Sequence, residues 1–328
     1  MTSRSVRSRY PPSGATSWPT GIRPTGVLVG LVKQLKAQVQ ELRQKGPAAR
    51  AELDRTVANF TEFLDELTRD VDGLTRQLDA TSREGDKKSL RQEVLGLLAR
   101  SYASLGKHRQ AAELLSRIPE PRGAGGKKPS PDEVKDYLET RILYAQELRQ
   151  DGQFRQAEQA LGEVGSRLEG QHNLSLIILG LEAEKEKIHL LEDRGEYSAA
   201  VSRWGTFMKS PQLKSLLADK DFEGVLAKYN EDDRKRMARP LERMHQDVVR
   251  MYFDCYYHRT YSLYKYGQNL KDARKRASYV KMAANNIVRL ENAANKEGWR
   301  FTQDQFNALL QEEAPLKEQY ELLKRTPR

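Results

Sequence analysis

The apolar residues of the N-terminal third recur at alternating intervals of four and three residues. The first run is Leu28, Val32, Leu35, Val39 and Leu42, and the second is Leu53, Val57, Phe60, Leu64, Leu67, Val71, Leu74 and Leu78. This 3.5-residue repeat is the seam of a coiled coil. Because Lys45–Pro47 ends one run and starts the next, we predict a heptad helical hairpin, an antiparallel coiled coil, over residues 26–82. A homodimeric coiled coil is the alternative. Asp at position 67 would bury an unpaired charge in this seam, and we expect strong destabilisation.

A second pattern begins near residue 86 and combines large apolar residues, a small residue, a glycine and a later alanine. It recurs three times, in Leu95, Leu98, Ala99, Tyr102, Gly106, Ala111 and Leu115, in Tyr144, Ala145, Leu148, Gly152, Ala157 and Leu161, and in Leu191, Gly195, Ala200 and Trp204. Glycine permits the turn between two helices, and alanine lets the two helix backbones approach closely. The pattern therefore predicts three helical hairpins with turns at Gly106, Gly152 and Gly195.

These residues resemble the tetratricopeptide repeat (TPR) family, whose pattern places a glycine at the turn and an alanine early in the second helix. The turn glycines are spaced more widely than the family's repeat of about 34 residues, and 121–133 is a predicted loop insertion. In the third copy, Lys187 replaces a large apolar residue and Ile188 replaces a small one. The resemblance implies a TPR-like α-solenoid, a stack of helical hairpins. A generic helical bundle is the alternative.

The predicted fold class is all-α throughout. Residues 1–25 are rich in Ser, Pro, Gly and Arg, and we expect a disordered basic arm. The TPR-like repeats occupy 86–211. For 212–328 we expect a degenerate repeat and capping helices, basic and rich in tyrosine.

Within this last region the pattern predicts short helices over 212–243, followed by a long helix from about residue 246. Gly267 and Ala273 suggest a degenerate fourth hairpin. A single helix from about Thr302 to Lys324 is expected to close the array.

Composition limits the compartment and the class of protein. Of the 328 residues, 38% are hydrophobic and 31% charged, a balance that suits helices with broad exposed faces. The single cysteine, Cys255, excludes an internal disulfide and a multi-cysteine zinc site, and it favours the cytoplasm. The longest apolar run, "GVLVGLV", is far shorter than a membrane span. We therefore expect a cytoplasmic protein without a membrane span.

The net charge of +10 is concentrated in the N-terminal arm and in the tyrosine-rich C-terminal region. One tyrosine-rich helix carries two stripes at helical spacing, namely Phe253, Tyr257, Tyr261 and Tyr264, and Tyr252 and Tyr256. In one interpretation these rings pack between hairpins. In the other, one stripe stacks on bases while Arg259, Lys265 and Arg274–Arg276 contact phosphates.

The sequence offers little catalytic chemistry. Glu186 and His189, and likewise Glu242 and His245, have the spacing that di-iron bundles use, but such a site needs two further carboxylates. Cys255 and His258 share a helix face and are two ligands short of a structural zinc site. The nucleophile elbow, the phosphate-binding loop and the dinucleotide-binding glycine motif are absent from the sequence. We predict no catalytic residues, no cofactor and no metal.

The family resemblance implies a non-enzymatic interaction scaffold that binds a peptide or a partner helix in a groove formed by the first helices of the hairpins. The basic residues expected to face this groove are Arg91, Arg100, Arg141, Lys185 and Arg259. Such cations suit an acidic peptide or a C-terminal carboxylate. Nucleic-acid binding by the C-terminal half is the alternative function, and self-association through the N-terminal hairpin is a third.

Overall fold

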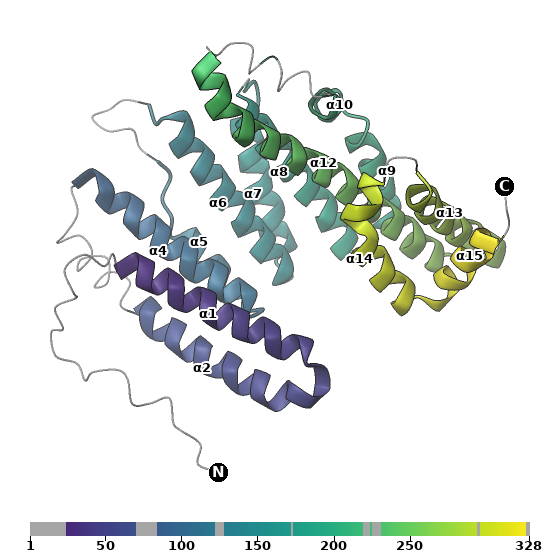
Figure 1. The fold of residues 1–328 in the computed structure, drawn as a ribbon, viewed down its shortest axis with the longest axis horizontal. Helices are drawn as coiled ribbons and strands as arrows, with labels where there is room; N and C mark the ends of the chain where they lie inside the picture. Colours follow the sequence, from purple (N-terminus) through teal and green to yellow (C-terminus); the bar gives the residue numbers. More distant parts are fainter. Residues whose placement is uncertain are drawn as a thin grey trace. The chain divides into compact units, whose positions relative to one another are not determined.

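A computed structural model describes residues 24–69, 84–121, 128–171, 173–218, 224, 231–293 and 296–325. Throughout these ranges the regular secondary structure is helical, which confirms the all-α class (Figure 1). Among the helices described, none combines the length and the apolar character needed to cross a membrane. The chain divides into two compact units, Met1–Ile118 and Pro119–Arg328.

The described part of the first unit consists of helices. Its elements are α1 (Pro24–Gln44), the 3-10 turn η2 (Gly46–Ala49), α2 (Arg50–Arg69), α4 (Glu84–Ser104) and α5 (His108–Ser116). Helices α1 and α2 pack against each other, and both contact α4. The Tyr102 hydroxyl of α4 donates a hydrogen bond to Asp65 of α2, at 2.7 Å. Burial raises the pKa of this phenol to about 12.

Burial in the first unit follows part of the heptad pattern. The buried seam residues are Val32, Val39, Leu42, Phe60 and Leu64, whereas Leu53, Val57 and Leu67 are partly exposed. Leu67 is therefore not a fully buried position of the seam, as the prediction for Asp at position 67 assumed, whereas Leu64 is. The predicted arm up to residue 23 and the seam residues Val71, Leu74 and Leu78 lie outside the described residues, as do the side chains of Leu28 and Leu35.

The second unit continues the helical order. Its described helices are α6 (Pro131–Gln150), α7 (Phe154–Leu168), α8 (Leu174–Asp193), α9 (Tyr197–Phe207), α10 (Pro211–Leu217), α12 (Glu231–Gln268), α13 (Ala273–Glu291), α14 (Glu297–Glu312) and α15 (Ala314–Arg325). Each hairpin packs on the next: α8 contacts α6 and α7, α9 contacts α12, and α12 contacts α13 (Figure 1). One apolar cluster surrounds Trp204 and another surrounds Phe306.

The three predicted turns share one backbone geometry. Gly106, Gly152 and Gly195 have φ between 75° and 77°, a left-handed conformation that only glycine adopts readily. In each turn the residue after the glycine donates its amide to the carbonyl five positions earlier, namely Lys107 to Tyr102, Gln153 to Leu148 and Glu196 to Leu191. This is the Schellman motif, which satisfies a free carbonyl at the end of a helix. The predicted turn positions are confirmed.

The alanine that follows each turn is fully buried. These residues are Ala111, Ala157 and Ala200.

The start of α6 is fixed by a capping box. The hydroxyl of Ser130 accepts a hydrogen bond from the Glu133 amide, while the Glu133 carboxylate accepts one from the Ser130 amide.

Two helix boundaries differ from the sequence prediction. Helix α12 begins at Glu231 and continues through Pro240, where short helices were expected. Leu241, Val248 and Cys255, at seven-residue intervals, pack into the Trp204 cluster and hold this face of the helix in place. At the C-terminus, the single predicted helix is two helices, α14 and α15, separated at Glu313. The reason is Pro315, which lacks an amide hydrogen and whose ring would clash with the carbonyl four residues earlier.

The α12–α13 pair is closely packed where a degenerate fourth hairpin was predicted. Gly267 lies in the last turn of α12, and a Cβ atom there would approach Cβ of Tyr279 to 2.6 Å. Glycine is therefore required at this position for close approach of the two helices. The turn between the helices follows Gly267 and ends at Asp272, the N-cap of α13.

Candidate functional site

The five basic residues predicted to line a groove belong to two different units. Arg91 and Arg100 lie on α4 in the first unit, where Arg100 is exposed and the Arg91 side chain is outside the description. Arg141, Lys185 and Arg259 lie on α6, α8 and α12 of the second unit.

Two of these three cations interact mainly with neighbouring hairpin residues. Arg141 donates to Glu163 of α7 at 2.7 Å and lies 4.6 Å from the centre of the Tyr144 ring. Arg259 packs near Gly205 of α9, and its Nε atom is buried without a hydrogen-bond partner among the described residues. Lys185 differs, because it lines a cavity.

This cavity, which we call the α6–α8–α12 groove, has a volume of about 450 Å³ and is also bordered by α14. Its charged lining consists of Glu182, Lys185, Glu186, Asp247, Arg250 and Asp254. Gln146, Met251, Phe301 and Gln305 complete it. The groove therefore lies on helices that open their hairpins, α6, α8 and α12.

The cations around the groove are largely engaged with other groups. Lys185 forms an ion pair with Asp254 at 3.0 Å. Arg149 of α6 lies 3.3 Å from Glu186 and also pairs with Asp193. The Arg250 guanidinium lies 5.5 Å from the centre of the Phe301 ring.

Negative charge is therefore in excess in the groove. Burial raises the pKa of Glu182, and the nearby carboxylates Glu139, Glu186 and Asp247 raise it further, against the effect of Lys185. The carboxylates that contribute to this raised pKa also produce a negative potential, which would stabilise a cation in the groove.

Next to the groove lies a buried polar cluster around Glu192. Its carboxylate accepts four hydrogen bonds, from Trp204 Nε1 at 2.9 Å, Ser262 Oγ at 2.5 Å, and His189 Nδ1 and His258 Nδ1 at 3.0 Å each. These donors come from α8, α9 and α12, so one side chain links three helices. Four acceptor positions are all that a carboxylate offers, and all four are used.

The surroundings of Glu192 stabilise its ionised carboxylate. Burial alone would raise the pKa of Glu192, but hydrogen bonds from His189 and His258 and the charge interactions with the same two side chains outweigh it and lower the pKa to about 2. The Trp204 indole also packs on both imidazoles, stacked on His258 and edge-on to His189. The orientation of both histidine rings is thus fixed from two sides.

Sequence spacing grouped these residues differently. Glu186 accepts a hydrogen bond from Gln146 and forms an ion pair with Arg149, both of α6, whereas the carboxylate partner of His189 is Glu192. Cys255 is buried in the Trp204 cluster, where burial raises the pKa of its thiol. The sequence signal for the cluster was Trp204 in a repeat position, together with the i, i+3 pair His189–Glu192.

The tyrosines of α12 pack against neighbouring helices and are not exposed on the surface. None of them is exposed; Tyr257 lies against Phe306, Tyr266 against Tyr279, and the Tyr264 hydroxyl donates to Glu313. These contacts favour the interpretation in which the rings pack between helices.

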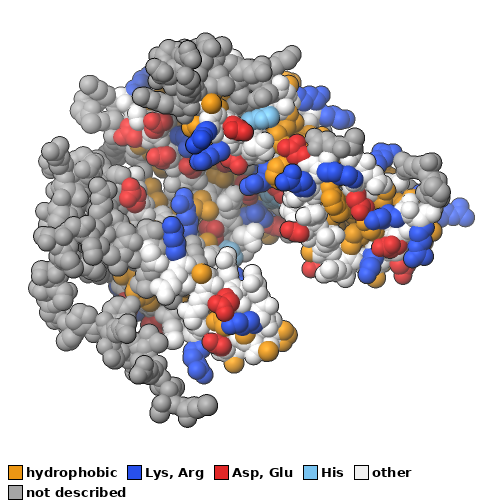
Figure 2. Space-filling model, viewed as in Figure 1, with side chains coloured by type: hydrophobic (Ala, Val, Ile, Leu, Met, Phe, Trp, Pro, Cys, Tyr) orange, Lys and Arg blue, Asp and Glu red, His pale blue; other side chains and the backbone are white. Residues whose placement is uncertain are grey.

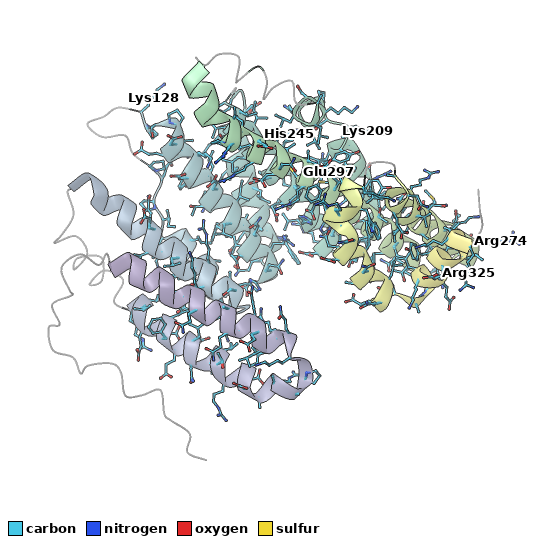
Figure 3. The ribbon with its side chains drawn as sticks, viewed as in Figure 1. Lys128, Lys209, His245, Arg274, Glu297 and Arg325 are labelled. Atoms are coloured by element: carbon cyan, nitrogen blue, oxygen red, sulfur yellow. The ribbon has the colours of Figure 1, made fainter. Side chains whose placement is uncertain are left out.

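The basic triplet Arg274–Arg276 lies on the exposed start of α13. Figure 3 shows Arg274 well away from His245. Figure 2 shows Lys and Arg interspersed with Asp and Glu on the visible face of these helices.

Comparison of the chain with protein-family models, with curated proteins and with solved structures finds no match.

Proposed function

We propose that the second unit is a non-enzymatic, TPR-like scaffold that binds a peptide along its opening helices. The observation that carries this proposal is the α6–α8–α12 groove, because α6, α8 and α12 each open a hairpin. Support also comes from the repeated Schellman turns and the buried alanine after each of them. The hairpins would stack as a solenoid and present these helices on one binding face.

The charge of the groove favours a basic peptide over the acidic one expected from the sequence. Lys185 forms an ion pair with Asp254, whereas within the part of the chain that the structure describes neither Glu182 nor Asp247 forms an ion pair. A lysine or arginine side chain entering between Glu182 and Asp247 would form charge-assisted hydrogen bonds, which are stronger than neutral ones. The excess of carboxylates would disfavour an acidic peptide.

For the first unit we propose an antiparallel coiled-coil hairpin of α1 and α2. The buried side chains Val32, Val39, Leu42, Phe60 and Leu64 support it, since they alternate at heptad intervals on two helices that pack together.

The groove is tested with fluorescent decapeptide pools that differ in one fixed central residue: Lys, Arg, Glu or Ala. Polarisation titrations of the full chain with EDTA are expected to give tighter binding of the Lys and Arg pools, by about tenfold, the effect of one charged hydrogen bond. The double variant Glu182→Gln/Asp247→Asn is expected to lose this preference.

Glu158→Gln is the matched control, because Glu158 is an exposed carboxylate on α7 outside the groove. It should keep the preference of the parent chain. Absence of binding by every pool, tighter binding of the Glu pool, or a preference that survives in the double variant would each refute the proposal.

A further inference from the structure

We infer that His189, Asp254 and His258 form a binding site for a divalent transition-metal ion, with Zn²⁺ as the best chemical fit. One potential ligand atom from each residue lies within 4.8 Å of the other two. The three residues come from α8 and α12, and the inference does not rest on the peptide proposal, although Asp254 also lines the groove. Two imidazoles and a carboxylate are a donor set that Zn²⁺ and Fe²⁺ accept, and four-coordinate Zn²⁺ would keep one position for water.

The spacing of the donor atoms is close to what a metal requires. His258 Nε2 lies 3.7 Å from Asp254 Oδ1. Metal–ligand bonds of 2.0–2.2 Å keep two ligand atoms within about 4.2 Å of each other. Any pair of donor atoms separated by more than this must move closer before all three bind one ion.

Glu192 sets which ring nitrogen carries the hydrogen when each imidazole is neutral, the form that binds metal. A carboxylate only accepts hydrogen bonds, so each Nδ1 atom that contacts Glu192 Oε2 at 3.0 Å carries the hydrogen. The lone pair of each neutral imidazole is then on Nε2. A carboxylate behind a metal-binding histidine is the usual supporting arrangement, because it orients the ring and increases its basicity.

The other contacts hold the three donors in place. Trp204 stacks on His258 with ring centres 5.7 Å apart, and the two imidazole centres are 4.3 Å apart. Asp254 is held by Lys185 at 3.0 Å and by Gln305 at 3.2 Å. Asp254 also lines the groove, which gives an ion a route to the site.

The test uses the full chain stripped of metal with EDTA and then dialysed. Titration with Co²⁺, followed by visible absorption, and with Zn²⁺, followed by calorimetry, should show saturable binding of one ion per chain, with Zn²⁺ displacing Co²⁺. His258→Gln and Asp254→Asn should abolish this binding. His245→Gln is the matched control, a histidine on the same helix α12 and outside the three-residue set (Figure 3); it should bind like the parent.

Glu192 is a positioning residue, and Glu192→Gln should weaken Zn²⁺ binding about 10–100-fold without abolishing it. Circular dichroism of each variant establishes that it is folded. If a ligand variant does not fold, the thermal midpoint of the unaltered chain decides, because an ion that binds only the folded state raises it. Absence of saturable binding or of a thermal shift in the parent, or parent-like binding in a folded His258→Gln or Asp254→Asn variant, would overturn the inference.

Discussion

Replacing Glu192 with glutamine is the sharpest test of what holds the second unit together. The Glu192 side chain is only 6% exposed and accepts four hydrogen bonds. Glutamine has nearly the same shape, but only its carbonyl oxygen accepts, and its amide group points N–H bonds at groups that are themselves donors. The substitution therefore removes the charge and leaves buried donors without acceptors.

The magnitude follows from the lowered pKa of Glu192. This pKa is about 2, compared with an ordinary value of 4.5, so the surroundings favour the ionised carboxylate over a neutral group. At 1.36 kcal/mol per pKa unit, this preference is about 3 kcal/mol. Breaking a buried charged network by removing one member costs about 3–5 kcal/mol in other proteins. We expect Glu192→Gln to lower the free energy of unfolding by about 3 kcal/mol, which corresponds to a fall of about 6–12 °C in the thermal midpoint.

The assay is thermal unfolding at pH 7 in EDTA, followed by circular dichroism and by tryptophan fluorescence, to which Trp204 contributes. Glu158→Gln is the control, because the Glu158 side chain is 61% exposed and forms a surface ion pair with Arg194. Surface ion pairs contribute about 0–1 kcal/mol. If the midpoints of the two variants fall by the same small amount, the Glu192 network does not stabilise the unit and the reasoning is refuted.

Three further substitutions, two of them with a matched comparison variant, test the local arguments. Leu64→Ala removes a fully buried side chain and should lower the free energy of unfolding in urea by about 2–5 kcal/mol, whereas Leu67→Ala, at a partly exposed position, should have a smaller effect. Gly152→Ala should destabilise the folded chain by about 1 kcal/mol or more because φ of Gly152 is 77°. Gly162→Ala should instead stabilise it by up to about 1 kcal/mol in the same thermal assay, because Gly162 lies inside α7 with no atom near the added methyl group. Burial opposes ionisation of Glu313, but its hydrogen bonds outweigh burial and lower its pKa. A carboxyl whose pKa is lowered in the folded state stabilises that state only at pH values above its unfolded pKa. Glu313→Gln should therefore be less stable than the parent at pH 7, and the difference in stability should shrink as the pH falls below 4.5.

The features that the sequence predicted well depend on local chemistry. The turns at Gly106, Gly152 and Gly195 need a residue that tolerates positive φ. Glycine meets that requirement without help from the rest of the chain, so the sequence alone locates the turns. The features that the sequence missed depend on long-range packing. Whether Pro240 ends a helix depends on burial of the residues that follow it, and burial is decided by partners elsewhere in the chain.

The same distinction explains the candidate sites. Spacing paired His189 with Glu186, since residues three apart share a helix face. In the structure His189 bonds to Glu192, which is also three residues away on the other side. The choice between these two partners is made by Trp204 and by His258, which lies 66 residues from Glu192 in the sequence. A pattern within one helix carries no information on such a partner.

Asp254 connects the two proposals and supplies a last prediction. Its Oδ2 atom holds Lys185 in the groove, while its Oδ1 atom lies near His258 Nε2. A bound Zn²⁺ would add two positive charges beside the groove and would neutralise one of the carboxylates that attract a cationic peptide. Zn²⁺ should therefore weaken binding of the Lys decapeptide pool to the parent chain, and linkage requires that the peptide weaken Zn²⁺ binding by the same factor.

This prediction is measured by polarisation of the Lys pool in EDTA and in saturating Zn²⁺, with His258→Gln as the control that binds peptide but no metal. The expected result is weaker binding in Zn²⁺ for the parent and no change for the variant. The Ala pool, which carries no fixed cation, should respond less than the Lys pool because the effect is electrostatic. Equal affinity of the parent for the Lys pool in both solutions, with Zn²⁺ bound, would show that the two sites do not interact through Asp254 and that the peptide cation lies elsewhere in the groove.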